Sequence, residues 1–176
     1  MEIKISEALN GIINYAREEA MRTGSYGIGP DHLYLGIVRH EDNHAFRALE
    51  ALGLPPATLR QYIDERIFTN ENIPYAELEH ITFSRPAQNI LSITILEATR
   101  LKSAEATPQH LLLALTRSTG SYGQACCRSH GIDYGRLIAY FEESGLLTER
   151  QSQPDRAEEE AGGEDNPAPK TRESET

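Results

Sequence analysis

Apolar residues recur at helical spacing in four successive segments of the first 67 residues. The first segment follows Ser6, a residue type that favours helix N-caps, and carries Leu9, Ile12, Ile13, Ala16 and Ala20. The second, HLYLGIV, follows Gly29-Pro30 and is apolar on most sides, which predicts a buried central helix. Two further predicted helices carry Ala45, Ala48, Leu49 and Leu52 before Gly53, and then Leu59, Tyr62 and Ile63. Neither copy of this pattern nor the rest of the chain shows a run of alternating β-branched residues, as a strand would. We therefore predict an all-α fold without a sheet.

The same four-helix pattern occurs a second time in the chain. Sliding residues 5–67 onto 83–145 without a gap gives 15 identities in 63 positions, including Ser6/Ser84, Pro30/Pro108 and His32/His110. One copy alone would have a marginal core. We therefore predict two pseudo-symmetric four-helix repeats, at 4–67 and 83–146, joined by a connector at 68–82 and packed into one domain over 1–147.

Composition limits both the rest of the chain and its partners. Residues 148–176 carry nine acidic and four basic residues and no Val, Ile, Leu, Met or aromatic residue, which is typical of a disordered acidic linker. The net charge of −10 argues against nucleic acid or an anionic membrane as a partner. No apolar run is long enough to span a bilayer, and a lone pair of adjacent cysteines fits a reducing cytoplasm. We expect a cytoplasmic protein whose folded domain is monomeric.

The duplicated unit resembles the N-terminal domain of the Clp (Hsp100) unfoldases. The resemblance rests on a capped first helix ending AREEAMRTG, the helix openings GPDHL and TPQHL, and the segment ALEALGL, and it covers about residues 4–146. The acidic segment after it is most similar to the ClpC branch.

The resemblance implies a domain that binds adaptor proteins and unfolded or tagged substrates for an ATPase ring coupled to a ClpP-type peptidase. The chain contains no G-x-x-x-x-G-K-[ST] phosphate loop, so we predict no enzyme activity and no cofactor here; ATP and Mg²⁺ would belong to ATPase modules outside it. A bacterial unfoldase fragment and a free-standing interaction scaffold both stay open. The reading frame after Thr176 would separate them.

A zinc metallopeptidase is the rival interpretation, because HEDNH at 40–44 matches H-E-x-x-H. That chemistry needs both histidines on one face of a helix. The motif lies in a polar stretch between two predicted helices, and the second repeat has STGSY there. We therefore predict a solvated turn and no metal site, so that replacing His40 and His44 with alanine should cost little stability.

Other chemistry-bearing residues fall at core positions of the predicted helices. His32 and His110 each sit third in a leucine-rich helix, which indicates packing histidines whose ring nitrogen satisfies a backbone group. Cys126 and Cys127 align with Ala48 and Leu49, so we expect small buried hydrophobes rather than reactive thiols.

The candidate binding residues are Ser6, Asp31, Ser84, Arg85 and Gln109. Ser6 and Ser84 begin the first helix of each repeat, where free N–H groups favour an anion, and Arg85 adds charge. The resemblance implies phosphoarginine pockets in which an acidic residue after the helix-opening proline holds the guanidinium. Asp31 keeps that acid and Gln109 does not, so we predict one dominant pocket, formed by Asp31 with the helix start at Ser6. Alternatively, all five are ordinary caps and first-turn residues.

Overall fold

The computed structural model describes residues 3–147, and the predicted acidic linker at 148–176 lies outside them. Repeat one contains the four predicted helices, which are α1 (Glu7–Thr23), α2 (Pro30–His40), α3 (His44–Ala51) and α4 (Pro56–Ile67). Repeat two contains their counterparts α5 (Arg85–Arg100), α6 (Pro108–Arg117), α7 (Tyr122–Ser129) and α8 (Tyr134–Glu143). The predicted all-α class and the two four-helix repeats are therefore confirmed.

The predicted helix signals act as expected at both ends. Ser6 and Ser84 cap α1 and α5, since each hydroxyl accepts a hydrogen bond from the backbone N–H three residues on. Gly53 and Gly131 follow α3 and α7 with φ of 102° and 77°, a conformation that glycine adopts without steric cost.

The expectation of no sheet is wrong in one small respect. Four two-residue strands form two parallel pairs: β1 (Lys4–Ile5) with β4 (Glu105–Ala106), and β2 (Gly27–Ile28) with β3 (Thr82–Phe83). Each pair joins the segment before the first helix of one repeat to the segment before the second helix of the other. Two residues are too few to produce an alternating pattern, so these strands have no periodic signal in the sequence.

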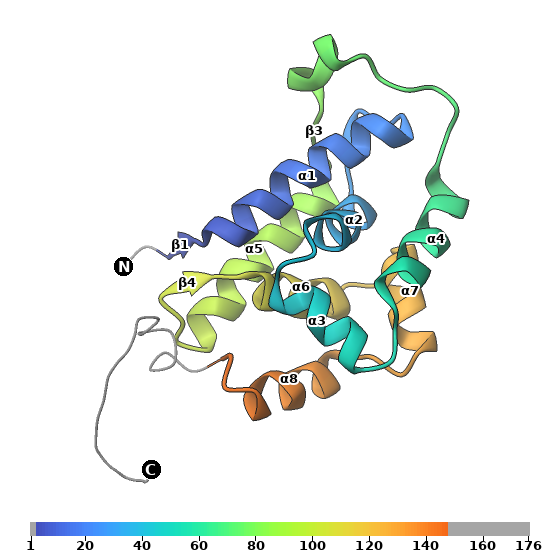
Figure 1. The fold of residues 1–176 in the computed structure, drawn as a ribbon. Helices are drawn as coiled ribbons and strands as arrows, with labels where there is room; N and C mark the ends of the chain where they lie inside the picture. The colour runs from blue at the N-terminus through green and yellow to red at the C-terminus, as the bar shows by residue number, and fades with distance from the viewer. Residues whose placement is uncertain (1–2, 148–176) are drawn as a thin grey trace, which may run out of the picture.

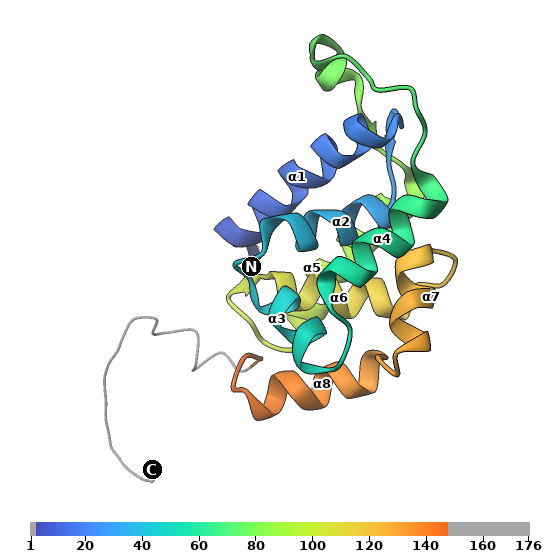
Figure 2. The ribbon, with the colours of Figure 1, turned by 45° about the vertical axis from the view of Figure 1, so that its right-hand side comes forward.

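Helices α2 and α6 form the centre of the molecule, as their apolar sequences predict. Figure 2 shows them in the middle, with α1 on one side and α8 on the other. All residues from His32 to Val38 are buried, and all from Pro108 to Thr116. Gly36 lets α2 approach α1 closely, because a Cβ there would lie 2.5 Å from the Ile12 carbonyl oxygen.

The two repeats interlock rather than simply touch. Helix α3 packs on α6 and α8, and α4 packs on α7, so the third and fourth helices of repeat one cover repeat two. The connector, which contains the 3₁₀ helix η1 (Tyr75–His80), projects beyond the C-terminal end of α1 (Figure 1). Its Thr69 and Ile73 N–H groups donate to the carbonyls of Thr23 and Met21, and so satisfy the end of α1.

Candidate functional site

The predicted binding residues lie at two junctions between the repeats. The Ser6 N–H donates to the Ala106 carbonyl (2.9 Å), and the Ser84 N–H donates to the Ile28 carbonyl (3.0 Å). The start of α1 therefore lies beside the start of α6, and the start of α5 beside the start of α2. The structure brings Asp31 to the end where Ser84 lies, so the predicted pairing of Asp31 with Ser6 is wrong.

The two capping serines differ in exposure. Ser6 is buried and its Oγ accepts from the Leu9 N–H at 3.1 Å. Ser84 is half-buried; its Oγ accepts from the Ala87 N–H at 3.3 Å and donates to the Ile28 carbonyl at 3.0 Å. Arg85, the first residue of α5, is exposed to solvent. The start of α5 is thus more accessible to solvent and more positive than the start of α1.

The Asp31 carboxylate forms hydrogen bonds between the two repeats. Its oxygens accept from the Tyr122 and Gly123 N–H groups, at 3.1 and 2.7 Å, at the first turn of α7. Burial raises the pKa of Asp31, and these two hydrogen bonds act against that rise. Its carboxylate therefore already serves as an N-terminal cap for a helix of the other repeat.

Gln109, the counterpart of Asp31, makes a different contact. Its Nε2 donates to the Leu146 carbonyl at 3.3 Å, and its buried Oε1 meets no hydrogen-bond partner among residues 3–147. The two junctions are therefore not equivalent, as the Asp/Gln difference predicts.

His32 and His110 are packing histidines, as predicted. Their Nδ1 atoms accept from the N–H groups of Gly29 (2.9 Å) and Thr107 (3.0 Å), the N-cap residues of α2 and α6. The His32 Nε2 also lies 3.0 Å from Thr23 Oγ1, whereas His110 Nε2 has no partner in the described part of the chain. Burial lowers the pKa of both imidazoles to about 4.

The HEDNH stretch is a turn, as predicted. His40 ends α2, Asn43 caps α3 and His44 begins it, so the two histidines do not share a continuous helix. His40 Nδ1 lies 3.1 Å from Asn43 Nδ2, within this turn. The geometry lacks the helix that places two metal ligands on one face in the H-E-x-x-H peptidases. Within residues 3–147, no three histidine, cysteine or carboxylate side chains lie close enough together to hold a metal ion.

Cys126 and Cys127 are free and buried in α7, in agreement with the prediction. Burial raises the pKa of the Cys127 thiol to about 12, which keeps it protonated and unreactive at neutral pH.

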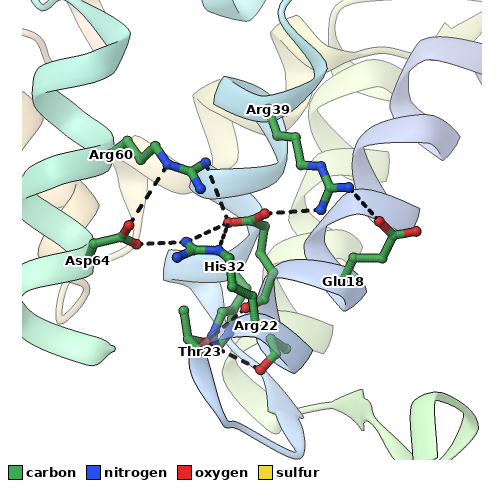
Figure 3. A network of polar contacts seen from close by, with 9 residues as sticks. Glu18, Arg22, Thr23, His32, Arg39, Arg60 and Asp64 are labelled. Atoms are coloured by element: carbon green, nitrogen blue, oxygen red, sulfur yellow. Dashed lines mark hydrogen bonds and ion pairs between the residues drawn. The ribbon is translucent and has the colours of Figure 1, made fainter. Parts of the chain in front are cut away.

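A buried carboxylate in each repeat is the polar feature that sequence reasoning missed. Glu19 is 1% exposed and contacts Arg22 (2.7 Å), Arg39 (3.1 Å) and Arg60 (3.6 Å), which come from α1, α2 and α4. Figure 3 shows these three arginines converging, with Glu18 and Asp64 at the edge of the network. Such charge-assisted contacts hold three helices in one orientation.

Repeat two has the same arrangement around Glu97. Its carboxylate contacts Arg100 and Arg117, and it accepts a hydrogen bond from the Tyr134 hydroxyl of α8 at 2.9 Å. Burial opposes ionisation of Glu97, but its hydrogen bonds outweigh burial and lower its pKa. These two networks could have been predicted from the sequence, because the repeat alignment has the identities Glu19/Glu97, Arg22/Arg100 and Arg39/Arg117.

These features define a protein module of two interlocked helical repeats, with a buried carboxylate network in each repeat and an accessible helix start, that of α5, at one of the two junctions. The family described as the Clp repeat (R) N-terminal domain matches residues 4–130, and the chain belongs to that family. It is a domain found in the Clp ATPases, and the matched region carries no catalytic module.

The similar curated proteins are much longer than this chain. One is the negative regulator of genetic competence ClpC/MecB of Bacillus subtilis (strain 168), 28% identical over 114 residues, which are 65% of this chain and 14% of that protein. Another is the chaperone protein ClpB of Oceanobacillus iheyensis, 26% identical over 114 residues with the same two coverages.

Solved structures show the same fold. The Hsp104 N-terminal domain from Candida albicans matches 85% of this chain and 98% of that one, with a TM-score of 0.66 and 15% identity. The N-terminal domain of ClpD from Arabidopsis thaliana matches 80% and 94%, with a TM-score of 0.59 and 16% identity. No helix within residues 3–147 is long and apolar enough to cross a membrane.

Proposed function

We propose that this domain docks adaptor proteins and unfolded or tagged substrates for a Clp-type ATPase ring. The observation that carries the proposal is the family match over residues 4–130 to a domain of the Clp ATPases. ATP and Mg²⁺ would act in modules other than this one, and proteolysis in an associated ClpP-type peptidase. The two buried, free thiols fit a reducing cytoplasm as the place of action.

A domain exchange tests this function. Residues 1–147 replace the N-terminal domain of the Bacillus subtilis ClpC relative, and ATP-dependent degradation of a labelled unfolded protein is measured with its peptidase. The same ATPase without an N-terminal domain sets the baseline, and its own domain sets the maximum. Degradation above the baseline is expected. A chimera that hydrolyses ATP but degrades no faster than the truncated ATPase would contradict the docking function and favour a free-standing scaffold.

We propose in addition that a phosphoarginine side chain binds at the start of α5. Ser84 and Arg85 offer an accessible helix N-terminus with one positive side chain, whereas Ser6 is buried. Asp31 lies at this same junction, and Gln109 at the other. Titration calorimetry with phosphoarginine should show weaker binding for Arg85→Ala, while Ser6→Ala serves as the matched control. If both variants bind like the parent, the five predicted residues are caps and first-turn residues only.

A further inference from the structure

The outer face of α1 carries a groove that neither the helix starts nor the buried ion networks explain. It is about 580 Å³ in volume and runs between α1 and the turn that joins α2 to α3. Three carboxylates (Glu7, Glu18 and Asp42) and two rings (Tyr15 and His40) line it. The groove is therefore both acidic and aromatic.

The fold itself does not require these side chains. Repeat two builds the same pair of helices, joined by a turn of different conformation, and the positions equivalent to the three carboxylates are Arg85, Leu96 and Gly120. Since the second copy folds without any of them, their presence in repeat one needs another reason.

Two backbone features that cost stability shape the groove. Gly11 lies inside α1, where glycine is unfavourable by about 1 kcal/mol relative to alanine. It leaves room for His40, because a Cβ at position 11 would lie 3.2 Å from His40 Cδ2. Glu41, with φ of 67°, turns the chain so that His40 and Asp42 both reach the groove. Departures of this kind from local preference concentrate at functional sites.

Two residues that line the groove already contact one arginine of this chain. The Arg39 guanidinium lies 4.5 Å from the centre of the Tyr15 ring and 2.7 Å from a carboxylate oxygen of Glu18. Aromatic face and carboxylate together are what a guanidinium favours. Asp42 has only a solvent-exposed contact with Arg47, and Glu7 has no cationic partner within 4.0 Å among residues 3–147. Two carboxylates are thus open to a second cation.

We propose that this groove docks an arginine-bearing segment of a partner protein, with Glu7 and Asp42 holding the guanidinium. The groove complements such a segment in charge, and its rings add aromatic surface of the kind that a guanidinium favours. This inference rests on the proposed docking function and gives it a surface and a partner chemistry. It is separate from the phosphoarginine proposal, because the groove is negative and would repel a phosphoryl group.

Binding of a short peptide to the full 176-residue chain tests the proposal. The probe is a fluorescein-labelled pentapeptide Gly-Arg-Ala-Arg-Gly, followed by anisotropy in about 50 mM and about 150 mM salt, because screening grows over this range. The variant Glu7→Gln/Asp42→Asn should bind at least about fivefold more weakly, which is about 1 kcal/mol. The matched control Glu50→Gln/Glu143→Gln removes two exposed charges outside the groove and should bind within about twofold of the parent.

Two further measurements complete the test: mapping of the bound peptide by NMR, and binding of a peptide with lysine in place of arginine. Amide resonances of Gly11, Tyr15 and His40 should shift on titration, and a lysine version of the probe should bind more weakly because it cannot stack or bind in a bidentate way. Equal weakening in the groove variant and the control, shifts spread over the surface, or no binding of the arginine probe would each overturn the proposal. The domain exchange described above uses an unfolded substrate and can succeed in all three cases, so the two failures are distinguishable.

Discussion

Acid should destabilise this domain through the two histidines in its interior. His32 and His110 accept hydrogen bonds at Nδ1 from the first N–H groups of α2 and α6, so a proton on Nδ1 removes the bond. It also places a positive charge at the positive end of a helix dipole, in a buried site. Both effects agree in direction with burial, which lowers the pKa of each imidazole to about 4.

The sign and size of this loss of stability in acid follow from proton linkage. The unfolded chain binds protons near the ordinary histidine pKa of about 6.5, and the folded chain only near 4, so stability falls as the pH drops from 6.5 to 4. Between about pH 7.5 and pH 5, each histidine should remove about 2 kcal/mol from the free energy of unfolding, and both together about 4 kcal/mol. This window lies above the ordinary range of the carboxyl groups.

Urea unfolding followed by far-UV circular dichroism at a series of pH values measures the effect. His32→Gln and His110→Gln are the informative variants, because glutamine at the third helical position can still accept from the N-cap N–H but does not titrate. Each should lose the contribution of its own histidine, about 2 kcal/mol between pH 7.5 and pH 5. The exposed His80→Gln is the control and should follow the parent. If either buried variant kept the full pH dependence of the parent, buried histidine protonation would not be its source.

Four further substitutions test contacts between helices and the backbone at helix ends, all by urea unfolding. Asp31→Ala should lower the free energy of unfolding by about 1–3 kcal/mol, because two N–H groups of α7 lose their acceptor, and no loss would mean that water replaces the carboxylate. Gly24→Ala should lower the free energy of unfolding by more than about 2 kcal/mol, because its Cβ would lie 2.1 Å from Thr69 Oγ1 at a φ of 84°. Lys102→Gly, at the equivalent position with a φ of 61°, should instead raise it by about 0.5–1 kcal/mol. Glu19→Gln should lower the free energy of unfolding by about 3 kcal/mol. This is the lower end for a broken buried ion pair, because the three arginines are about one-third exposed. An unchanged free energy of unfolding would show that the network adds no stability.

The helices were predictable because each buries one face, and burial imposes a period that a single sequence displays. The internal repeat added the equivalence of α2 with α6 and of the caps at Ser6 and Ser84. The four short strands were not predictable, since a two-residue pairing between distant segments leaves no periodic trace. The HEDNH turn was predictable from its polar surroundings alone.

The candidate site was predictable in its residues but not in its assembly. A repeat alignment shows that Ser6 corresponds to Ser84 and Asp31 to Gln109, but it cannot say that the strands exchange partners between the repeats. That exchange moves Asp31 to the junction of Ser84, and it gives the carboxylate a structural role at α7 that no local pattern contains. The α1 groove was unpredictable for a similar reason, because His40 and Asp42 reach it only through the turn at Glu41.

The internal symmetry separates the residues that stabilise the fold from those available for recognition. Two polar pairs that the repeats share, Glu19 with Glu97 and His32 with His110, are buried and bonded inside each repeat. Glu18 differs from its counterpart Leu96, and both reach the surface. A buried network required by the fold must be present in both copies, whereas a recognition surface needs only one. Exchanging surface residues between the repeats should therefore change binding while leaving the free energy of unfolding within the roughly 0.5 kcal/mol typical of surface substitutions.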